Sequence, residues 1–352
     1  MGCMEEVKAT QSKKKVKDQL PSKIGGYKPI QALNSGAMGS LWLCRDPSLD
    51  RLVVAKRLHS NLNQQDLYIK RFLQEGSILA HLNHPSIIQP YALWKDSDGN
   101  YTMSMEYVQG SSLKDLLLRN KRPPIWVVET ILYELLNALS HAHRNGVTHR
   151  DLKPANMMID KDGRVRLLDF GIAHTETPLD IGKELTQTGC IIGTAAYMSP
   201  EQIMGEKVNY ASDLFSVGII ACEMLIGENL FRGKDFEETR ENILKMKFKP
   251  EVFPDDVPKP LRKFVLKLLN KRASKRPSSA CDAANELADL LSEYPRDMTP
   301  YIAEWADTVN EDQPIDSIIS PKPQKTTFKY GIGFLLGVVV TAIAFIGIQL
   351  AI

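Results

Sequence analysis

The stretch VTHRDLKPANMMID places two charged side chains and an amide close together, directly before a short apolar run. They are Asp151, Lys153 and Asn156. A further carboxylate, Asp169, follows the stretch VRLL and precedes Phe170 and a glycine. Transfer of a γ-phosphoryl group needs charge neutralisation and alignment rather than covalent help from the protein. This set of side chains therefore suits phosphoryl transfer from a nucleotide.

Each of these side chains fits one part of that chemistry. Asp169 can hold Mg²⁺ against the phosphates, and the amide oxygen of Asn156 can supply a second contact, with Mn²⁺ as an alternative ion. Asp151 can accept or orient the attacking hydroxyl. Lys153 can face the transferred phosphate. A glycine after the metal-binding aspartate, Gly171, lets the following loop move.

A lysine and a glutamate further upstream add to these charges. Lys56 lies within LVVAKRL, a run typical of a strand, and Glu75 lies in the helical stretch RFLQEGSILAHL. A lysine in a strand is usually just solvated at an edge. An ion pair with Glu75 would instead hold the Lys56 ammonium toward the α- and β-phosphates of a nucleotide.

The stretch LNSGAMGSLW has two glycines, Gly36 and Gly39, three residues apart in a strand-like context. It would contain a phosphate-covering G-x-G-x-x-G loop if position 34 were glycine instead of Asn34. Alone, the stretch favours an ordinary turn, because turns use Asn and Gly freely. The other motifs change this interpretation to a nucleotide loop, since asparagine tolerates left-handed backbone angles at modest cost.

These motifs follow one another in the order of the protein kinase signature set. They are NSGAMG, the lysine of VVAK, Glu75, HRDLKPAN, DFG and SPE at 199–201. The chain thus resembles a protein kinase over residues 27–291. DLKPAN together with Thr194 of GTAAYMSPE resembles the Ser/Thr class. LTQTGCIIGTAAYMSPEQ and SDLFSVGIIACEML resemble the bacterial eukaryotic-like Ser/Thr kinases, many of which are membrane-anchored.

The resemblance implies ATP as the phosphate donor and protein Ser/Thr hydroxyls as acceptors. It assigns catalytic roles to Asp151, Lys153, Lys56 and Glu75, and metal binding to Asn156 and Asp169. Met105 falls at the gatekeeper position, and residues 106–108 fall at the hinge that binds adenine. The residues implied to contact the nucleotide are Leu33, Asn34, Ser35, Gly36, Ala37, Met38, Gly39, Leu41, Val54, Lys56, Met105, Glu106, Val108 and Met158.

The resemblance also implies a regulated activation loop. Thr186 and Thr188 fall in this loop and are candidate phosphosites. A phosphate there would place about −2 charge opposite Arg150 and could order the loop. Autophosphorylation on the loop is therefore expected.

Further residues match positions that hold the two lobes in shape. His149 and Phe170 match the hydrophobic spine that links the lobes. Asp213 matches the helix aspartate that braces the catalytic loop, and Arg276 of KRPS matches the arginine that pairs with the glutamate of A-P-E, here Glu201. The chain departs from the family pattern at three positions without losing a required charge: Asn34, Val54 and Ser199.

Two other classes of function stay open. A membrane-tethered pseudokinase scaffold would be expected to lack at least one of the five key residues, which are all present: Lys56, Glu75, Asp151, Asn156 and Asp169. A kinase-fold enzyme acting on a small molecule or a lipid fits less well, because GTAAYMSPE lies where the family docks polypeptides. A homodimer is one option for activation.

Two lobes must position these residues. Short β-branched and apolar runs between turn formers predict an antiparallel sheet in residues 27–107, interrupted by one helix at 66–82 with Leu67, Phe72 and Leu79 on its apolar face. Residues 108–291 are mostly helical, with helices at 125–146, ended by Gly146, and at 212–227. The predicted fold class is α+β. It is a bilobal protein-kinase fold, with a small antiparallel-sheet N-lobe with one main helix and a larger, mostly helical C-lobe, plus a C-terminal transmembrane helix.

The two ends of the chain differ from the centre. Residues 1–26 are predicted to be a basic disordered tail, solvated or attracted to anionic lipid. Residues 292–330 are polar and predicted to be a juxtamembrane linker, in which YIAEWADTV can form a short helix. Residues 331–352 carry no charge, and as a helix they would extend about 33 Å, enough to cross a bilayer core of about 30 Å. Lysines precede this single-pass anchor, which places the kinase domain in the cytoplasm.

The composition excludes several other classes. The net charge is +2, so no strong field indicates a nucleic-acid partner. The 5 cysteines are scattered without a C-x-x-C pair, which argues against a zinc site and a disulfide scaffold and fits a reducing cytosol. The expected partners are protein substrates, ATP and membrane lipid.

Overall fold

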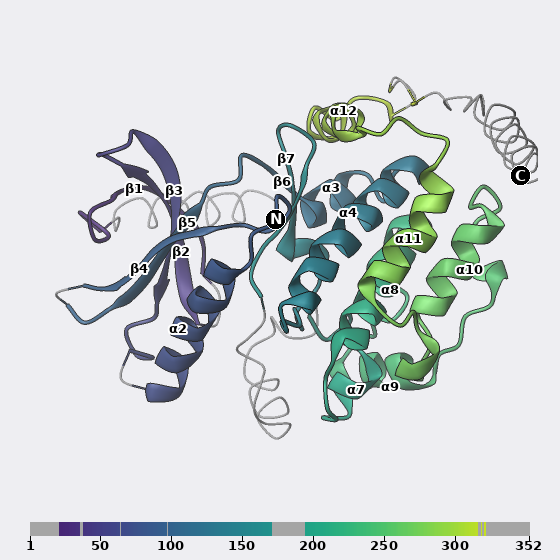
Figure 1. Ribbon diagram of the computed structural model, residues 1–352, viewed down its shortest axis with the longest axis horizontal. Helices are drawn as coiled ribbons and strands as arrows, with labels where there is room; N and C mark the ends of the chain where they lie inside the picture. Colours follow the sequence, from purple (N-terminus) through teal and green to yellow (C-terminus); the bar gives the residue numbers. More distant parts are fainter. Residues whose placement is uncertain are drawn as a thin grey trace, which may run out of the picture.

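The computed structural model of the protein describes residues 21–35, 38–63, 65–96, 98–170, 194–315, 318 and 320–321, with the backbone alone at 34–35. These residues form two lobes (Figure 1). One is a sheet with a single long helix, and the other is mostly helical. The predicted bilobal α+β architecture is therefore confirmed. Residues 1–20 of the predicted tail and the apolar segment 331–352 lie outside the described part.

The N-lobe is built on a five-stranded sheet in the order β1-β2-β3-β5-β4. Its strands are β1 (Lys28–Ser35), β2 (Gly39–Asp46), β3 (Arg51–Leu58), β4 (Pro90–Lys95) and β5 (Tyr101–Glu106), and every adjacent pair is antiparallel. The apolar runs of the sequence coincide with these strands. Strand β3 is central, because it pairs with β2 on one side and with β5 on the other.

One helix, α2 (Asp66–His81), packs on this sheet. Gly76 allows the close approach, because a Cβ there would lie 2.6 Å from the Leu93 side chain of β4. Phe72 and Leu79 are buried as expected, whereas Leu67 is 44% exposed. The prediction for Leu67 was wrong because, at 3.6 residues per turn, this residue lies more than a quarter turn around the helix from Phe72 and Leu79.

The C-lobe begins with three short strands and two helices. Strands β6 (Gly110–Ser112), β7 (Met157–Asp160) and β8 (Val165–Leu167) form a second sheet. Helix α3 (Leu113–Arg119) follows β6 directly, and α4 (Ile125–Arg144) comes next. The predicted end of α4 is confirmed, since Gly146 has φ +77°, a conformation that glycine adopts without steric cost.

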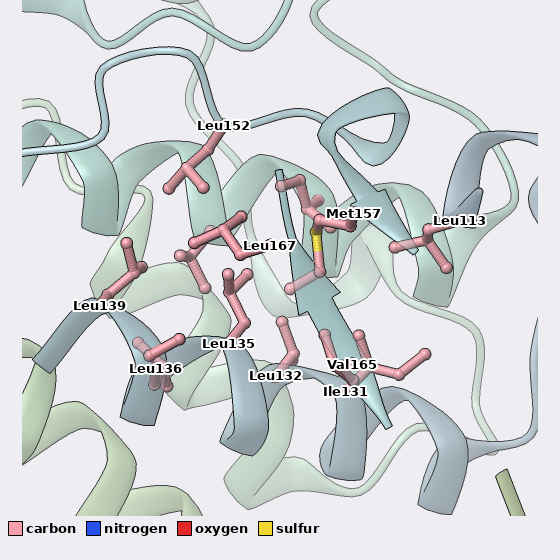
Figure 2. Packing of buried hydrophobic residues seen from close by; sticks show 14 of the residues in the cluster. Leu113, Ile131, Leu132, Leu135, Leu136, Leu139, Leu152, Met157, Val165 and Leu167 are labelled. Atoms are coloured by element: carbon pink, nitrogen blue, oxygen red, sulfur yellow. The ribbon is translucent and has the colours of Figure 1, made fainter. Parts of the chain in front are cut away.

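The core of the C-lobe surrounds α4. Leucine and isoleucine side chains of α4 meet the β7 and β8 side chains Met157, Val165 and Leu167 (Figure 2). On its other sides α4 contacts α8 (Tyr210–Ile226) and α11 (Ala280–Leu291). Helix α8 is buried over nearly its whole length, as its apolar sequence predicts. The remaining elements are α7 (Pro200–Ile203), α9 (Phe236–Lys245), α10 (Lys259–Leu268) and the 3-10 turns η1 (Pro154–Asn156), η3 (Pro250–Val252) and η4 (Ala273–Lys275).

A last helix, α12 (Thr299–Asn310), contains the YIAEWADTV stretch of the predicted linker. It is docked rather than solvated: Ile302 and Trp305 are fully buried, and the helix contacts α3 and β7 (Figure 1). The helices of the described residues include none that is both long enough and apolar enough to cross a membrane.

Candidate active site

An ion-pair network joins the two lobes. Lys56 of β3 donates from Nζ to Oε1 of Glu75 on α2 at 2.5 Å and to Oδ1 of Asp169 at 3.1 Å. Asp169 belongs to the C-lobe, two residues after the end of β8. A single, partly buried ammonium therefore connects the central strand, the N-lobe helix and the DFG aspartate.

The direction of Lys56 follows from the alternation of side chains along β3. Val54 and Leu58 share its face and belong to the main core, whereas Val53 belongs to a small cluster on the other side of the sheet. Arg57, one residue later, points to that other side and pairs with Asp96 at 2.7 Å. A lysine at position 56 is thus forced inward, where Glu75 and Asp169 can reach it.

Charge neutralisation keeps Lys56 and Asp169 ionised. Burial alone would lower the pKa of Lys56, but the nearby carboxylates of Asp169 and Glu75 outweigh this effect and raise its pKa well above the ordinary value. Burial alone would raise the pKa of Asp169, but the Lys56 ammonium outweighs it and lowers that pKa. Asp169 is consequently a carboxylate at neutral pH, the form that binds a hard cation.

The second cluster of charges lies in the catalytic loop, residues 149–156. Lys153 donates from Nζ to both carboxylate oxygens of Asp151, at 2.8 and 3.1 Å, and to Oγ1 of Thr194 at 3.2 Å. The Asn156 amide donates to the Asp151 backbone carbonyl at 2.8 Å and to its Oδ2 at 3.0 Å. The Asp151 carboxylate is therefore held from two sides.

A single backbone hydrogen bond connects the two clusters. The N–H of Leu168 donates to the carbonyl of Asn156 at 2.8 Å, which sets Asn156 beside the residue that precedes Asp169. The proposed metal ligands are thereby brought to neighbouring positions on adjacent segments. Glu75, Lys56 and Asp169 are therefore connected through Leu168 to Asn156 and Asp151.

His149 fixes both segments through one imidazole. Its Nε2 donates to the carbonyl of Leu168 at 3.0 Å, and its Nδ1 accepts from the N–H of Asp151 at 3.3 Å. This pattern requires a neutral ring with the proton on Nε2. Burial favours that form, because it lowers the pKa of His149 despite nearby carboxylates. Phe170 packs against the ring at a centroid distance of 4.6 Å.

Arg150 has a left-handed backbone, φ +68°, which costs a non-glycine residue free energy and persists only where surroundings enforce it. The buried carboxylate of Asp213 on α8 accepts from the N–H groups of His149 at 2.8 Å and Arg150 at 2.9 Å. The Gln202 amide donates to the Arg150 carbonyl at 2.7 Å. The bracing role implied for Asp213 thus has a direct geometric counterpart.

The residues present can supply two oxygen ligands to a magnesium ion. The amide nitrogen of Asn156 is engaged by Asp151, so its amide oxygen is the atom left to face a cation, and one oxygen of Asp169 remains beyond the Lys56 contact. The described residues contain no cluster of three or more His, Cys, Asp or Glu side chains suited to a metal. Mg²⁺ commonly binds one or two protein oxygens and completes its shell with phosphate and water.

The wall expected to hold adenine combines both sheets. Val54 of β3 lies opposite Met105 of β5, and both are buried beside the hinge. Leu41 of β2 and Met158 of β7 are partly buried against the same core. Behind the hinge, Arg166 of β8 forms an ion pair with Glu106. The predicted adenine-contact side chains are thus brought to the junction between the lobes.

The glycine stretch is described only in part. Gly36 and Ala37 lie outside the described residues, while Met38 is packed against the core. Gly39 has a structural reason to be glycine, because a Cβ there would lie 2.4 Å from the Arg57 carbonyl of β3. Close pairing of β2 with β3 therefore accounts for this glycine. The candidate phosphosites Thr186 and Thr188 and the loop glycine Gly171 also lie outside the described part.

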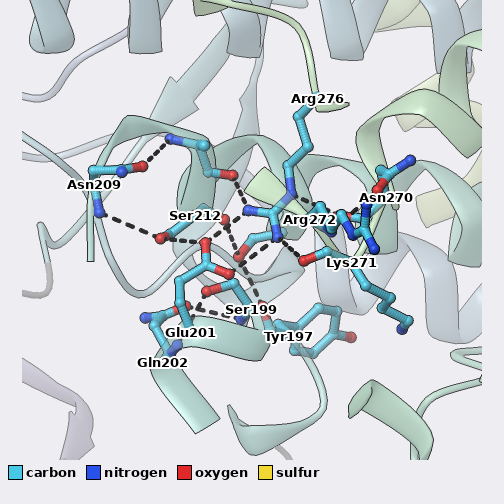
Figure 3. Close-up of polar contacts among 12 residues, drawn as sticks. Tyr197, Ser199, Glu201, Gln202, Asn209, Ser212, Asn270, Lys271, Arg272 and Arg276 are labelled. Carbon is cyan, nitrogen blue, oxygen red and sulfur yellow. Dashed lines mark hydrogen bonds and ion pairs between the residues drawn. The ribbon is translucent and has the colours of Figure 1, made fainter. Parts of the chain in front are cut away.

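The end of the activation segment is anchored by a buried ion pair (Figure 3). Arg276 donates to Glu201 from both terminal nitrogens, at 2.6 and 3.0 Å. It also donates to the carbonyl of Ala211 at 2.6 Å, and Ser212 donates to Glu201 at 2.6 Å. The pairing expected from the KRPS and SPE motifs is present. Ser199 caps α7 by accepting from the N–H of Gln202.

Replacing Arg276 with alanine is expected to destabilise the protein by about 3–5 kcal/mol, because Glu201 would keep a buried charge without its partner. The side chain of Arg276 is 0% exposed and that of Glu201 is 10% exposed. Urea unfolding at pH 7 measures the change, with the exposed Arg272→Ala as the matched control. Equal stability of the two variants would show that the ion pair contributes nothing.

The loss of stability in Arg276→Ala should depend on pH. Burial alone would raise the pKa of Glu201, but hydrogen bonds from Arg276 and Ser212 outweigh it and lower that pKa. A depressed pKa stabilises the fold above the carboxylate's ordinary pKa, and this stabilisation is lost as the pH falls through the folded-state pKa. The difference between the unmutated protein and Arg276→Ala is therefore expected to shrink in acid.

Some contacts of the site were not anticipated from the sequence. His143 of α4 donates from Nε2 to Asp213 at 2.8 Å, and Tyr197 donates to Glu223 of α8 at 2.6 Å. Each pair joins residues far apart in the chain. The spacing of the motifs carries no signal for such partners, although the sequence places both His143 and Glu223 within helices that are otherwise strongly apolar.

Comparison with known proteins places this geometry in a family. Residues 27–288 match the protein kinase domain. The chain therefore belongs to the protein kinase family, whose members use ATP and a divalent metal.

Among bacterial relatives, the chain is 36% identical to a probable serine/threonine-protein kinase of Streptomyces coelicolor, over 71% of this chain and 37% of the relative. It is 30% identical to serine/threonine-protein kinase PknD of Protochlamydia amoebophila, over 74% of this chain and 29% of that relative. Serine/threonine-protein kinase pkn2 of Myxococcus xanthus is 36% identical, over 76% of this chain and 32% of that relative. The chain spans about a third of the length of these relatives.

Proposed function

We propose that this chain is an active, ATP-dependent Ser/Thr protein kinase. The observation that carries the proposal is the position of two polar clusters, Glu75–Lys56–Asp169 and Asn156–Asp151. They are joined by the backbone hydrogen bond from Leu168, next to Asp169, to Asn156. Nothing about folding alone requires all five polar side chains to meet at the junction of the lobes. The names of the bacterial relatives support protein hydroxyls as the acceptors.

Each side chain takes one part of the reaction. Lys56, held by Glu75, orients the α- and β-phosphates of ATP. Asp151 accepts or orients the proton of the attacking hydroxyl, while Lys153 moves from the Asp151 carboxylate toward the transferred phosphate. Asp169 and the amide oxygen of Asn156 would hold Mg²⁺, which neutralises phosphate charge when bound. The adenine ring would lie between Val54 and Met158.

The test of this function is the chemical identity of the product. The full chain, incubated with labelled ATP, Mg²⁺ and casein, should place phosphate on serine and threonine of casein and of the chain itself. Phosphoamino-acid analysis measures this, and we expect Thr186 or Thr188 among the modified residues. Phosphotyrosine alone, or labelling of a small molecule alone, would contradict the proposal.

We also propose that residues 331–352 anchor the kinase domain to the cytoplasmic face of a membrane. The absence of charged residues over this length and the lysines at 322, 325 and 329 support it. The full chain should sediment with membranes and resist carbonate extraction, whereas a chain lacking 331–352 should be released. Recovery of the full chain in the soluble fraction would overturn the anchor.

A further inference from the structure

Helix α12 lies beyond the part of the chain that matches the protein kinase domain, yet it is packed like a core element. Ile302, Trp305, Ala306 and Val309 are all buried and lie at the i, i+3, i+4 and i+7 spacing of one helix face. The opposite face carries Glu304 and Asp307, which are exposed. The helix therefore has one defined docking face, and that face is occupied.

The first turn of α12 rests on the turn between β7 and β8. Gly163 in that turn has φ +81°, and a Cβ there would lie 1.9 Å from the carbonyl oxygen of Thr299. The two backbones are in direct contact, which any side chain at 163 would prevent. Tyr301 of α12 adds an edge-to-face contact with Trp126 of α4 at a centroid distance of 6.3 Å.

Polar contacts from β6 and α3, the two elements that follow the hinge, hold the last turn of α12. Asn310 accepts through Oδ1 from Oγ of Ser111 on β6 at 3.1 Å. Arg119 of α3 donates to the Asn310 backbone carbonyl at 2.8 Å. This places a cation at the carbonyl end of the helix, where the helix dipole favours positive charge.

The pairing of β6 with β7 connects these contacts of α12 to the expected nucleotide site. Strand β6 begins two residues after Val108 of the hinge, and Ser112 of β6 pairs with Met158 of β7, the residue expected beneath adenine. Asp160 at the end of β7 lies 3.7 Å from Arg166, which also pairs with Glu106 of the hinge. Strand β6 is only 3 residues long. Such a short strand gains much of its order from its neighbours.

We infer that α12 is a positioning element of the kinase, which holds β6 through Asn310, packs on β7, and so sets the affinity for ATP. The inference rests on the proposed function. A preorganised site binds more tightly because less conformational freedom is lost on binding. When the α12 contact is loosened, the hinge exit and the floor under adenine sample more conformations, and ATP binds more weakly.

Asn310→Ala in the full chain tests this inference by removing the acceptor of the Ser111 hydroxyl. The loss of one such hydrogen bond should weaken ATP binding about three- to tenfold, measured by calorimetry with ATP and Mg²⁺. The KM for ATP should rise by the same factor, with a smaller change in kcat. Asp307→Ala, one turn earlier on the exposed face, is the matched control and should bind ATP like the unmutated chain.

Asn310→Asp provides the rescue, because a carboxylate oxygen in place of the amide Oδ1 can still accept from the Ser111 hydroxyl. It should restore most of the ATP affinity. ATP affinity that is equal in Asn310→Ala and Asp307→Ala overturns the inference, as does a fall in melting temperature without a change in affinity, or a failed rescue. An unmutated chain that binds no ATP would overturn the proposed function as well, which distinguishes the two failures.

Discussion

Replacing Asp151 with asparagine should reduce kcat for phosphotransfer by about 10²–10⁴-fold, the range for loss of a general base. Asparagine has the same shape, and its oxygen can still accept from Lys153. However, the asparagine side chain cannot take the proton of the attacking hydroxyl, and it lacks the negative charge that orients this hydroxyl. We therefore expect the loss in kcat, with the KM for ATP little changed, in a steady-state assay with labelled ATP.

The control for this variant is Asp289→Asn, which makes the same chemical change on the exposed surface of α11. It should leave both constants unchanged. Calorimetric ATP binding by Asp151→Asn should also persist, because the adenine wall and Lys56 are intact. Retained phosphotransfer in Asp151→Asn would show that another group takes the hydroxyl proton.

Replacing Lys56 with methionine should lower kcat/KM by about 10²–10³-fold, because it removes a preorganised cation from the phosphates. It should also lower stability, since the Glu75 and Asp169 carboxylates would lose the ammonium between them. Phosphotransfer and urea unfolding, measured on the same preparation, separate the two effects.

Two further variants sharpen this result. Arg57→Met makes a similar change one residue along β3, on the other face of the sheet, and should keep activity while losing only its contact with Asp96. In the double variant Lys56→Met with Glu75→Gln, one buried carboxylate is neutralised, so part of the stability should return without activity. Recovery of activity in the double variant would contradict a role for Lys56 in phosphate binding.

The strands of the N-lobe and the long helices of the C-lobe could be predicted because their hydrophobic period is local. The end of α4 was also predictable, since Gly146 marks it. The meeting of Lys56 with Glu75 was suggested by the order of the kinase motifs rather than by spacing. Their 19-residue separation carries no distance information by itself.

Contacts between distant segments could not be derived from local sequence patterns, and the family resemblance implied only some of them, such as that of Arg276 with Glu201. The resemblance implied that Asp213 braces the catalytic loop, but the backbone N–H groups through which it holds the left-handed Arg150 leave no signature in the sequence. The burial of α12 could be predicted in part, because Ile302, Trp305 and Val309 follow a helical period. Its polar, proline-containing surroundings favoured a linker instead, and only tertiary packing shows that this helix covers α3 and β7.

The measurement that tests the account most directly is γ-phosphate transfer from ATP by the full unmutated chain, with Mg²⁺ and with EDTA. Asp151→Asn and Lys56→Met should be compared at equal concentration. The arrangement of the five polar residues predicts transfer that requires the metal and is lost in both variants. An unmutated chain that neither binds ATP nor transfers phosphate would instead define a kinase-fold scaffold without catalysis.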